Sequence, residues 1–327
     1  MPETILVTGA AGFIGYHLSR RLLADGYTVV GLDNLNDYYD VSLKQSRLDA
    51  LQLLERFTFL RTDLADADAL MQIFAKYRPT RVVNLAAQAG VRYSIDHPRA
   101  YVDSNLIGFF NILEAVRAYP VEHLLYASSS SVYGNQQKVP FSVSDPVDRP
   151  ISLYAATKKS NELMAYTYAH LFQVPATGLR FFTVYGPFGR PDMAYFKFTK
   201  KILAGETIDV YNHGDLKRDF TYVDDIVDCL VKMLPKPPTA DEAGDRYRIY
   251  NIGNHTPVEL MHFLEVLQDT IGRRAEIRFL PMQAGDVYQT YADVTDTNRD
   301  FGFVPSVPIE TGLPRFFDWY RKYYGIG

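Results

Sequence analysis

The strongest constraint on the fold is a glycine-rich turn set between an apolar run and a helical pattern. Residues 4–8 read TILVT, a run of apolar and β-branched residues that is typical of a buried strand. Gly9, Gly12 and Gly15 follow it, and apolar side chains recur at helical spacing from Phe13 to Leu23. A strand, a tight turn and a helix in this order predict the first unit of a doubly wound parallel sheet.

The first half of the chain continues to alternate short apolar runs with helical patterns. This alternation predicts parallel strands with helices on both faces of the sheet, and ligands of such sheets bind at the carboxyl ends of the strands. The further expected strands are 27–32, 57–61, 81–85, 123–128 and 176–181, and the further expected helices are 66–77, 99–119 and 154–172.

The alternation of strands and helices ends near Thr183. Residues 185–191 (YGPFGRP) are too rich in turn formers for a regular helix or strand. We therefore expect an α/β fold with a Rossmann-type domain over residues 1–182. A smaller α/β lobe that binds the substrate is expected over residues 183–327. Some of its segments, around 219–252, are expected to return and pack on the first domain.

Composition and charge argue against several classes of function. The formal net charge of the 327 residues is −4, which gives no sign of the basic surface that nucleic acid or an anionic membrane attracts. No apolar run is long enough to span a bilayer, and because a strand pattern starts at residue 4 we expect no targeting leader. Cys229 is the only cysteine, which fits a reducing compartment. We expect a cytoplasmic protein without a metal site, a nucleic-acid partner or a membrane partner.

The glycine turn and an acidic residue after the second strand together predict a dinucleotide site. The pyrophosphate would meet the amides at the start of the first helix, where a Cβ would block its approach. Asp33 ends the second strand, about 20 residues further on, as the ribose-binding position requires. Its carboxylate would accept from the ribose hydroxyls and repel a 2′-phosphate, which favours NAD over NADP. A simple cap at the strand end is the alternative role for Asp33.

The G-x-x-G-x-x-G spacing, with Asp63-Leu64 after the third strand and Leu85-Ala86-Ala87 after the fourth, resembles the extended short-chain dehydrogenase/reductase superfamily. The resemblance covers essentially the whole chain. It implies that residues 63–64 lie against the adenine and that the small residues 86–87 let the backbone approach the cofactor. The expected NAD contacts are Gly9, Gly12, Phe13, Ile14, Gly15, Asp33, Asn34, Asp63, Leu64, Leu85, Ala86, Ala87, Tyr154 and Lys158.

A phenol and an ammonium four residues apart are the candidate catalytic pair. Tyr154 and Lys158 fall on one face of the expected helix 154–172. A free tyrosine has a pKa near 10 and is a poor base at neutral pH, but a fixed cation beside it favours the phenolate. The Y-x-x-x-K pattern also occurs by chance in many helices, so the nucleotide motif is what gives it weight.

The serine run of residues 128–134 (SSSSVYG) follows the fifth strand and resembles a segment of UDP-galactose 4-epimerase and its relatives. The resemblance implies that Ser129 is the catalytic hydroxyl beside Tyr154. Relatives that dehydrate the sugar carry an Asp-Glu pair in this segment, and relatives that decarboxylate UDP-glucuronate carry a Glu. Ser130 and Ser131 stand at those places here. Without a carboxylic acid, the hydride is expected to return to the carbon that it left, which is epimerisation through a transient 4-ketone.

The segment from Arg180 to Ala194 (RFFTVYGPFGRPDMA) resembles the UDP-glucuronate 4-epimerases, whereas UDP-galactose epimerases have an Asn at position 183. A uronate carries a carboxylate at C5, and an arginine with hydroxyl donors suits it. An alternative role for Arg190 is support of its loop or contact with a phosphate. The expected substrate contacts are Ser129, Ser130, Ser131, Thr183, Arg190, Arg92, Arg218 (diphosphate) and Asp286 (uridine ribose).

Two other functions compete with a UDP-hexuronate epimerase that uses NAD. The first alternative is another enzyme: a UDP-glucose/UDP-galactose epimerase or a UDP-glucuronate decarboxylase would share most of these motifs. Outside the enzymes, an NAD-sensing regulator would keep the nucleotide site, although it has no need of Ser129, Tyr154 and Lys158. The apolar faces of helices 99–118 and 154–172 would pair in a four-helix bundle if the chain forms a homodimer as its relatives do.

Overall fold

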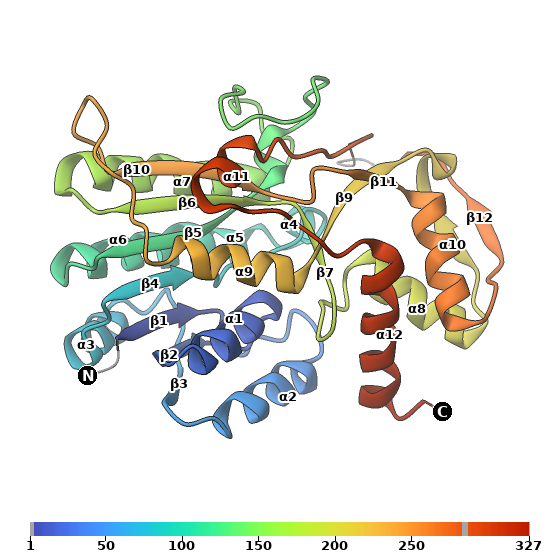
Figure 1. Cartoon of the computed structure of the whole chain (residues 1–327), viewed down its shortest axis with the longest axis horizontal. Coiled ribbons are helices and arrows are strands. Elements are labelled where there is room, and N and C mark those ends of the chain that lie inside the picture. Colours follow the sequence, from blue (N-terminus) through green and yellow to red (C-terminus); the bar gives the residue numbers. More distant parts are fainter. Residues whose placement is uncertain (1–2, 283–286, 327) are drawn as a thin grey trace.

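The computed structural model describes residues 3–282 and 287–326 (Figure 1). The strands are β1 (Thr4–Thr8), β2 (Thr28–Asp33), β3 (Phe57–Arg61), β4 (Arg81–Asn84), β5 (His123–Ser129), β6 (Ala176–Phe181), β7 (Thr183–Tyr185), β8 (Ile208–Val210), β9 (Lys217–Tyr222), β10 (Tyr247–Ile252), β11 (Pro257–Glu259) and β12 (Ile277–Phe279). The α-helices are α1 (Phe13–Ala24), α2 (Val41–Gln52), α3 (Ala67–Tyr77), α4 (Tyr93–Asp96), α5 (Pro98–Tyr101), α6 (Gly108–Ala118), α7 (Leu153–Phe172), α8 (Ala194–Ala204), α9 (Val223–Met233), α10 (Leu260–Ile271), α11 (Thr295–Phe301) and α12 (Ile309–Tyr324). The shorter helical segments are η1 (Val102–Ile107), η2 (Ser130–Tyr133) and η3 (Tyr211–Gly214).

A parallel sheet organises the larger part of the molecule and confirms the predicted fold class. Within the described residues seven strands pair in the order β10-β6-β5-β4-β1-β2-β3, and every neighbouring pair is parallel. The strand order reverses beside β1, so β1 and β4 diverge from a switch point of the kind at which ligands bind. Because all strands run the same way, the loops that follow them gather at one edge of the sheet.

Alternate side chains of the central strands supply two separate cores. On β1, Ile5 and Val7 belong to one hydrophobic cluster, which also contains residues of α1 and α9. Leu6, between them, belongs to a second cluster with residues of α3, α6 and α7. This is the outcome expected for a parallel sheet that is covered on both faces. The layers are visible in Figure 1, where α1 and α9 lie in front of the sheet.

A smaller lobe stands at one end of the sheet (Figure 1). Its core is a third cluster, rich in aromatic rings, contributed mainly by α8, α10 and α12 together with β8 and β9. Short strands complete it within the described ranges: β11-β9-β7 form one sheet and β12-β8 another. Two segments of the C-terminal half lie with the larger part instead, because β10 pairs with β6 and α9 packs on α1. The domain boundary at residues 182/183 stays a prediction.

The structure differs from the expectation in two local details. The helix expected over 99–119 is interrupted, because η1 is a π-helical segment between α5 and α6. The side-chain amide of Asn161 on α7 donates to the backbone carbonyl of Asn105 at 2.6 Å, and this bond competes with regular helical hydrogen bonding. In the turn-rich segment 185–191, Tyr185 ends β7, which pairs with β9, whereas residues 186–191 form no regular helix or strand, as expected. Among the described helices, none has the length and apolar character to cross a membrane.

Candidate active site

A cavity of about 990 Å³ opens at the carboxyl ends of the central strands and extends toward the smaller lobe. Residues after β1, β2, β3, β4, β5 and β6 line it, as the switch-point argument requires. Every predicted cofactor residue and every predicted substrate residue that the structure describes lines this one cavity. Asp286 lies outside the described residues. Across residues 3–282 and 287–326, no group of three or more metal-ligating side chains is found.

The glycine turn forms a cradle that a side chain would fill. Gly9 has φ +70°, in the left-handed region, and a Cβ added to it would lie 2.9 Å from the backbone nitrogen of Ala86. A Cβ on Gly15 would lie 2.0 Å from the carbonyl oxygen of Gly9. Gly12 precedes α1 as its N-cap, and no side chain caps the helix. The turn is therefore shaped for close approach of a pyrophosphate to the start of α1, and it fits NAD.

Acidic side chains beyond the glycine turn are placed for the adenosine end of a dinucleotide. The carboxylate of Asp33 accepts from the backbone N–H groups of Ala11 (3.2 Å) and Leu35 (2.8 Å), which fixes it at the end of β2. Asn34 donates to the carboxylate of Asp63 at 2.9 Å. These bonds hold the predicted ribose-binding and adenine-binding segments side by side along the cavity wall.

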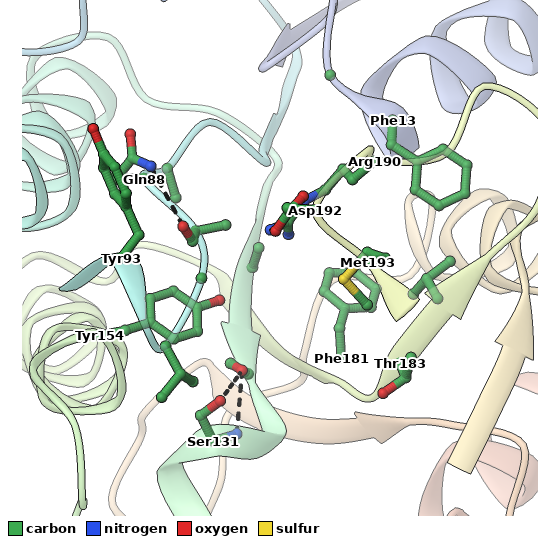
Figure 2. Close-up of a pocket in the computed structure, with 18 of the residues that line it drawn as sticks. Phe13, Gln88, Tyr93, Ser131, Tyr154, Phe181, Thr183, Arg190, Asp192 and Met193 are labelled. Atoms are coloured by element: carbon green, nitrogen blue, oxygen red, sulfur yellow. Dashed lines mark hydrogen bonds and ion pairs between the residues drawn. The ribbon is translucent and has the colours of Figure 1, made fainter. Parts of the chain in front are cut away.

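Tyr154 and Lys158 lie on adjacent turns of α7, which begins beside the cavity. Ser152 caps the helix by accepting from the backbone N–H of Ala155 at 3.1 Å, so the first turn carries Tyr154 to the cavity. Figure 2 shows the phenol of Tyr154 pointing into the cavity. Lys158 is 3% exposed, and its ammonium donates to the carbonyl of Ala127 on β5 at 2.9 Å. Helix and sheet thus fix the positions of both groups.

The environment shifts the pKa values of both titratable groups. Burial raises the pKa of the Tyr154 phenol above its ordinary value, which opposes the phenolate, against smaller lowering contributions from a hydrogen bond with Ser129 and the charge of Arg190. Burial lowers the pKa of Lys158 to about 8, so its ammonium still carries a charge at neutral pH. A positively charged ring bound beside Tyr154 would lower the pKa of the phenol and so favour the phenolate.

The serine segment presents its hydroxyls to the same space. Ser129 ends β5, and its hydroxyl accepts from the backbone N–H of Ser131 (3.2 Å) and donates to the Ser131 hydroxyl (3.1 Å) (Figure 2). Ser130 lines the cavity with them. Ser128, one residue earlier, donates to buried Glu162 at 2.7 Å, and Glu162 also pairs with Arg180. The buried pair anchors α7 to β6 beneath the site.

Arg190 is held by a carboxylate of its own loop. Its Nε and Nη2 donate to Asp192 Oδ1 and Oδ2 at 3.0 and 2.6 Å, a bidentate ion pair (Figure 2). The hydroxyl of Tyr38 donates to the same carboxylate at 3.1 Å. Burial alone would raise the pKa of Asp192, but the charge and hydrogen bonds of Arg190, with the bond from Tyr38, hold it below its ordinary value. Asp192 is therefore ionised and cannot donate a proton.

Asp192 corrects one premise of the sequence argument, which placed no carboxyl group beside the sugar. The serine segment contains no carboxyl group, but Asp192 reaches the cavity from another segment, the loop after β7. A signal was present in the sequence, because Asp192 follows Arg190 by two residues in an irregular, proline-containing loop. The correction leaves the conclusion intact, since an ion-paired carboxylate lacks the proton that elimination requires.

Arg47 is a further residue that the sequence argument missed. It is fully buried, and all five of its N–H groups donate: Nη1 to Ala11 O (2.9 Å) and Tyr39 Oη (2.7 Å), Nε to Phe188 O (3.2 Å), and Nη2 to Phe188 O (2.7 Å) and Gly189 O (3.3 Å). It joins the glycine turn to the loop that carries Arg190. No local pattern marks such a residue, because its partners are backbone carbonyls distant in sequence.

The predicted nucleotide contacts lie toward the smaller lobe. The guanidinium of Arg92 lies 5.5 Å from the ring centroid of Tyr211, and both side chains line the cavity. Arg218 on β9 donates to the carbonyls of Lys217 (2.9 Å) and Tyr288 (3.1 Å). The structure therefore places both cations within reach of an anionic ligand, and their individual roles stay predictions.

Comparisons with known proteins agree with this geometry. Residues 5–253 match the family described as NAD dependent epimerase/dehydratase. Protein CapI of Staphylococcus aureus is 53% identical, over 98% of this chain and 99% of that protein. A probable UDP-glucuronate 4-epimerase of Rhizobium meliloti is 47% identical, over 98% of this chain and 97% of that protein.

Solved structures give the same result. A UDP-glucuronic acid 4-epimerase from Bacillus cereus, in complex with UDP-glucuronic acid and NAD, superposes with a TM-score of 0.89 at 33% identity, over 98% of this chain and 100% of the other. A UDP-glucose 4-epimerase from Thermotoga maritima, with UDP-glucose, gives a TM-score of 0.85 at 30% identity, over 98% and 99%. Both chains are covered almost completely, so the similarity includes the cavity and both of its walls.

Proposed function

This chain belongs to the NAD dependent epimerase/dehydratase family, and on that basis we propose that it catalyses the NAD-dependent 4-epimerisation of UDP-glucuronate to UDP-galacturonate. The family resemblance expected from the sequence motifs is confirmed by the match and by the relatives. The enzyme is accordingly an isomerase, and its cofactor is NAD. The observation that carries the choice of a uronate is Arg190, an arginine in the wall of the cavity that the phenol of Tyr154 enters.

The chain's own groups move the proton of the reaction. NAD, when bound in the glycine cradle, would supply the acceptor for the hydride from C4 of the sugar and the donor that returns it to the same carbon. Tyr154 as phenolate takes the proton from the sugar's O4 and later gives it back, while the buried ammonium of Lys158 stabilises the phenolate. Ser129 lies beside this path and orients the sugar hydroxyl. The product has the same composition as the substrate, so no net oxidation occurs.

Arg190, Thr183 and the serine hydroxyls serve to hold the C5 carboxylate. Oxidation at C4 makes a β-keto acid, which loses CO₂ when the bond to the carboxylate stands perpendicular to the plane of the ketone. Charge-assisted hydrogen bonds from a planar guanidinium fix the orientation of a carboxylate. The hydroxyls of Thr183, Ser130 and Ser131 reach the same cavity and complete the set of donors. The enzyme thus protects the intermediate that it forms.

Incubation with UDP-glucuronate separates this function from its competitors. The proposal expects an isomer of unchanged mass; a pentose nucleotide with release of CO₂ would instead identify a decarboxylase. Turnover of UDP-glucose with none of UDP-glucuronate would identify a hexose epimerase. A protein that binds NAD and converts neither sugar would behave as an NAD-sensing regulator.

We further propose a homodimer built on α6 and α7. Large apolar side chains are exposed on the neighbouring helices: Phe110 is 45%, Leu163 57% and Tyr166 45% exposed. A second copy of the same face, related by a two-fold axis, would bury them in a four-helix bundle. A cytoplasmic location, which the single cysteine fits, likewise stays a prediction.

Leu163→Arg is expected to convert the dimer to a monomer, because it places a charge at the centre of the apolar face. Light scattering during gel filtration measures the mass of each form. Leu53→Arg is the matched control, since Leu53 is 86% exposed and lies outside α6 and α7. A wild-type protein that is monomeric at micromolar concentration would contradict the proposal.

A further inference from the structure

Arg190, the proposed binding group for the substrate carboxylate, already binds a carboxylate of the protein. Asp192 takes the Nε and Nη2 edge of the guanidinium, with both of its oxygens engaged. The ion pair is accessible to solvent, because the side chains of Arg190 and Asp192 are 25% and 24% exposed. Both residues line the same cavity as Tyr154. A ligand in that cavity therefore meets an arginine whose charge is largely offset.

A guanidinium has five N–H donors, and the ion pair uses the Nε edge. A second carboxylate in the cavity is attracted by the cation of Arg190, whose Nε edge Asp192 already occupies. It is also repelled by the negative charge of Asp192 behind the same group. The anion is thus oriented by the plane of the guanidinium but held less tightly than a bare arginine would hold it.

Weaker binding of the substrate carboxylate by Arg190 would help the inversion at C4. Hydride leaves C4 from one face of the sugar and must return to the opposite face, while the cofactor and Tyr154 keep their positions. The ring must therefore turn between the two transfers, and the hydrogen bonds to the carboxylate at C5 must shift as it turns without leaving the carboxylate unbound. Uniformly tight binding of substrate and intermediate would slow that step without stabilising any transition state.

We propose that Asp192 is a specificity-determining residue that lowers the affinity of Arg190 for the substrate carboxylate. The lower affinity allows the sugar to turn between the two hydride transfers. The inference rests on the proposed function, because it requires a uronate substrate. The hydroxyl of Tyr38 donates to the carboxylate of Asp192 but leaves its charge unchanged, whereas Arg190 binds both carboxylate oxygens. Asp192 acts on the substrate through Arg190 and through its own charge, not by transferring a proton.

Asp192→Asn tests the proposal, since it removes the charge and keeps the shape. Binding of UDP-glucuronate is measured by calorimetry on the NAD-bound protein in a Tyr154→Phe background, so that the ligand is not turned over. The dissociation constant for UDP-glucuronate is expected to fall by about tenfold, while that for UDP-glucose stays within about twofold. With Tyr154 intact, Asp192→Asn is expected to lower KM for UDP-glucuronate and to lower kcat as well.

Two matched variants separate this effect from others. Asp209→Asn removes the same charge from another aspartate that lines the cavity, one paired with Lys201 and Arg278 and not with Arg190. Tyr38→Phe removes the hydrogen bond to Asp192 but leaves its charge. Each is expected to change the affinity for UDP-glucuronate by less than about twofold.

The possible results are distinct. Weaker binding of UDP-glucuronate by Asp192→Asn would show that the residue only positions Arg190 and would overturn the proposal, as would unchanged binding. An equal gain in Asp209→Asn would assign the effect to the general field of the cavity and would also overturn it. A protein with Asp192 intact that binds both nucleotides but converts no uronate would refute the proposed function itself. Tighter uronate binding with slower turnover, confined to Asp192→Asn, is the supporting result.

Discussion

Tyr154→Phe is expected to lower kcat by roughly 100- to 10,000-fold, the usual range for loss of a positioned general base. The phenol is the titratable group on α7 that points into the cavity, and Lys158 lies one turn further along the same helix. Phenylalanine keeps the ring and its packing against Tyr101, whose centroid lies 6.0 Å away, so KM, NAD content and melting temperature should change little. Steady-state kinetics and a thermal melt of the purified protein measure these quantities.

The control for this change is Tyr93→Phe. Tyr93 lines the same cavity, and its ring stacks on His97 at 4.1 Å between centroids. Loss of its hydroxyl should reduce kcat by only a few-fold. If Tyr154→Phe kept more than about a tenth of wild-type kcat, the proton would be passing through another group and the proposed mechanism would be wrong.

Arg190→Ala is expected to give the second largest effect, and it concerns the product as well as the rate. Hydrogen bonds to a charged group contribute about 1.5–3 kcal/mol, so kcat/KM for UDP-glucuronate should fall by roughly 10- to 150-fold. Some of the ketone formed should then lose CO₂, because the orientation of its carboxylate is no longer fixed. Chromatography of the nucleotide sugars measures epimer and pentose in one experiment.

Removal of Arg190 also leaves Asp192 without the partner that both of its oxygens bind. The double variant Arg190→Ala/Asp192→Asn separates that added repulsion from the loss of the donor. Thr183→Ala removes one neutral hydroxyl from the same wall and should show a smaller change in the same direction. The role assigned to Arg190 fails if neither variant slows epimerisation and neither yields any pentose.

The inner strands of the central sheet were predictable because they are buried on both faces. Short runs rich in apolar residues indicate such strands, and the predicted strands 4–8 and 176–181 coincide with β1 and β6. The predicted strand 57–61 also coincides with β3, although β3 is an edge strand and is only partly buried. Helix α2 escaped prediction for the opposite reason. Its buried face includes Lys44 and Arg47, so the helix lacks the apolar periodicity by which helices are recognised.

The interruption of the helix over 99–119 also has a tertiary cause, since the carbonyl of Asn105 accepts from Asn161 on another helix. The residue pattern of a single helix cannot reveal a hydrogen bond that comes from another helix. Local sequence therefore predicts where elements lie better than it predicts how they are interrupted.

At the site, too, residues in local motifs were predicted, whereas residues that act through contacts distant in the sequence were missed. Residues named by motifs that follow strands, such as Asp33 and Ser129, reach the cavity because the topology brings all strand ends to one edge. Asp192 and Tyr38 were missed because their importance lies in a contact between loops 154 residues apart in sequence. Motifs thus identified groups that line the cavity and missed groups that hold those side chains in place.

The account depends most on the return of one hydride to the carbon that lost it. The decisive measurement is NMR of the product formed from UDP-glucuronate that carries deuterium at C4, with no NAD added beyond that bound to the purified protein. The account predicts UDP-galacturonate with the deuterium still at C4. Hydrogen from solvent at C4, or a pentose as the main product, would contradict it.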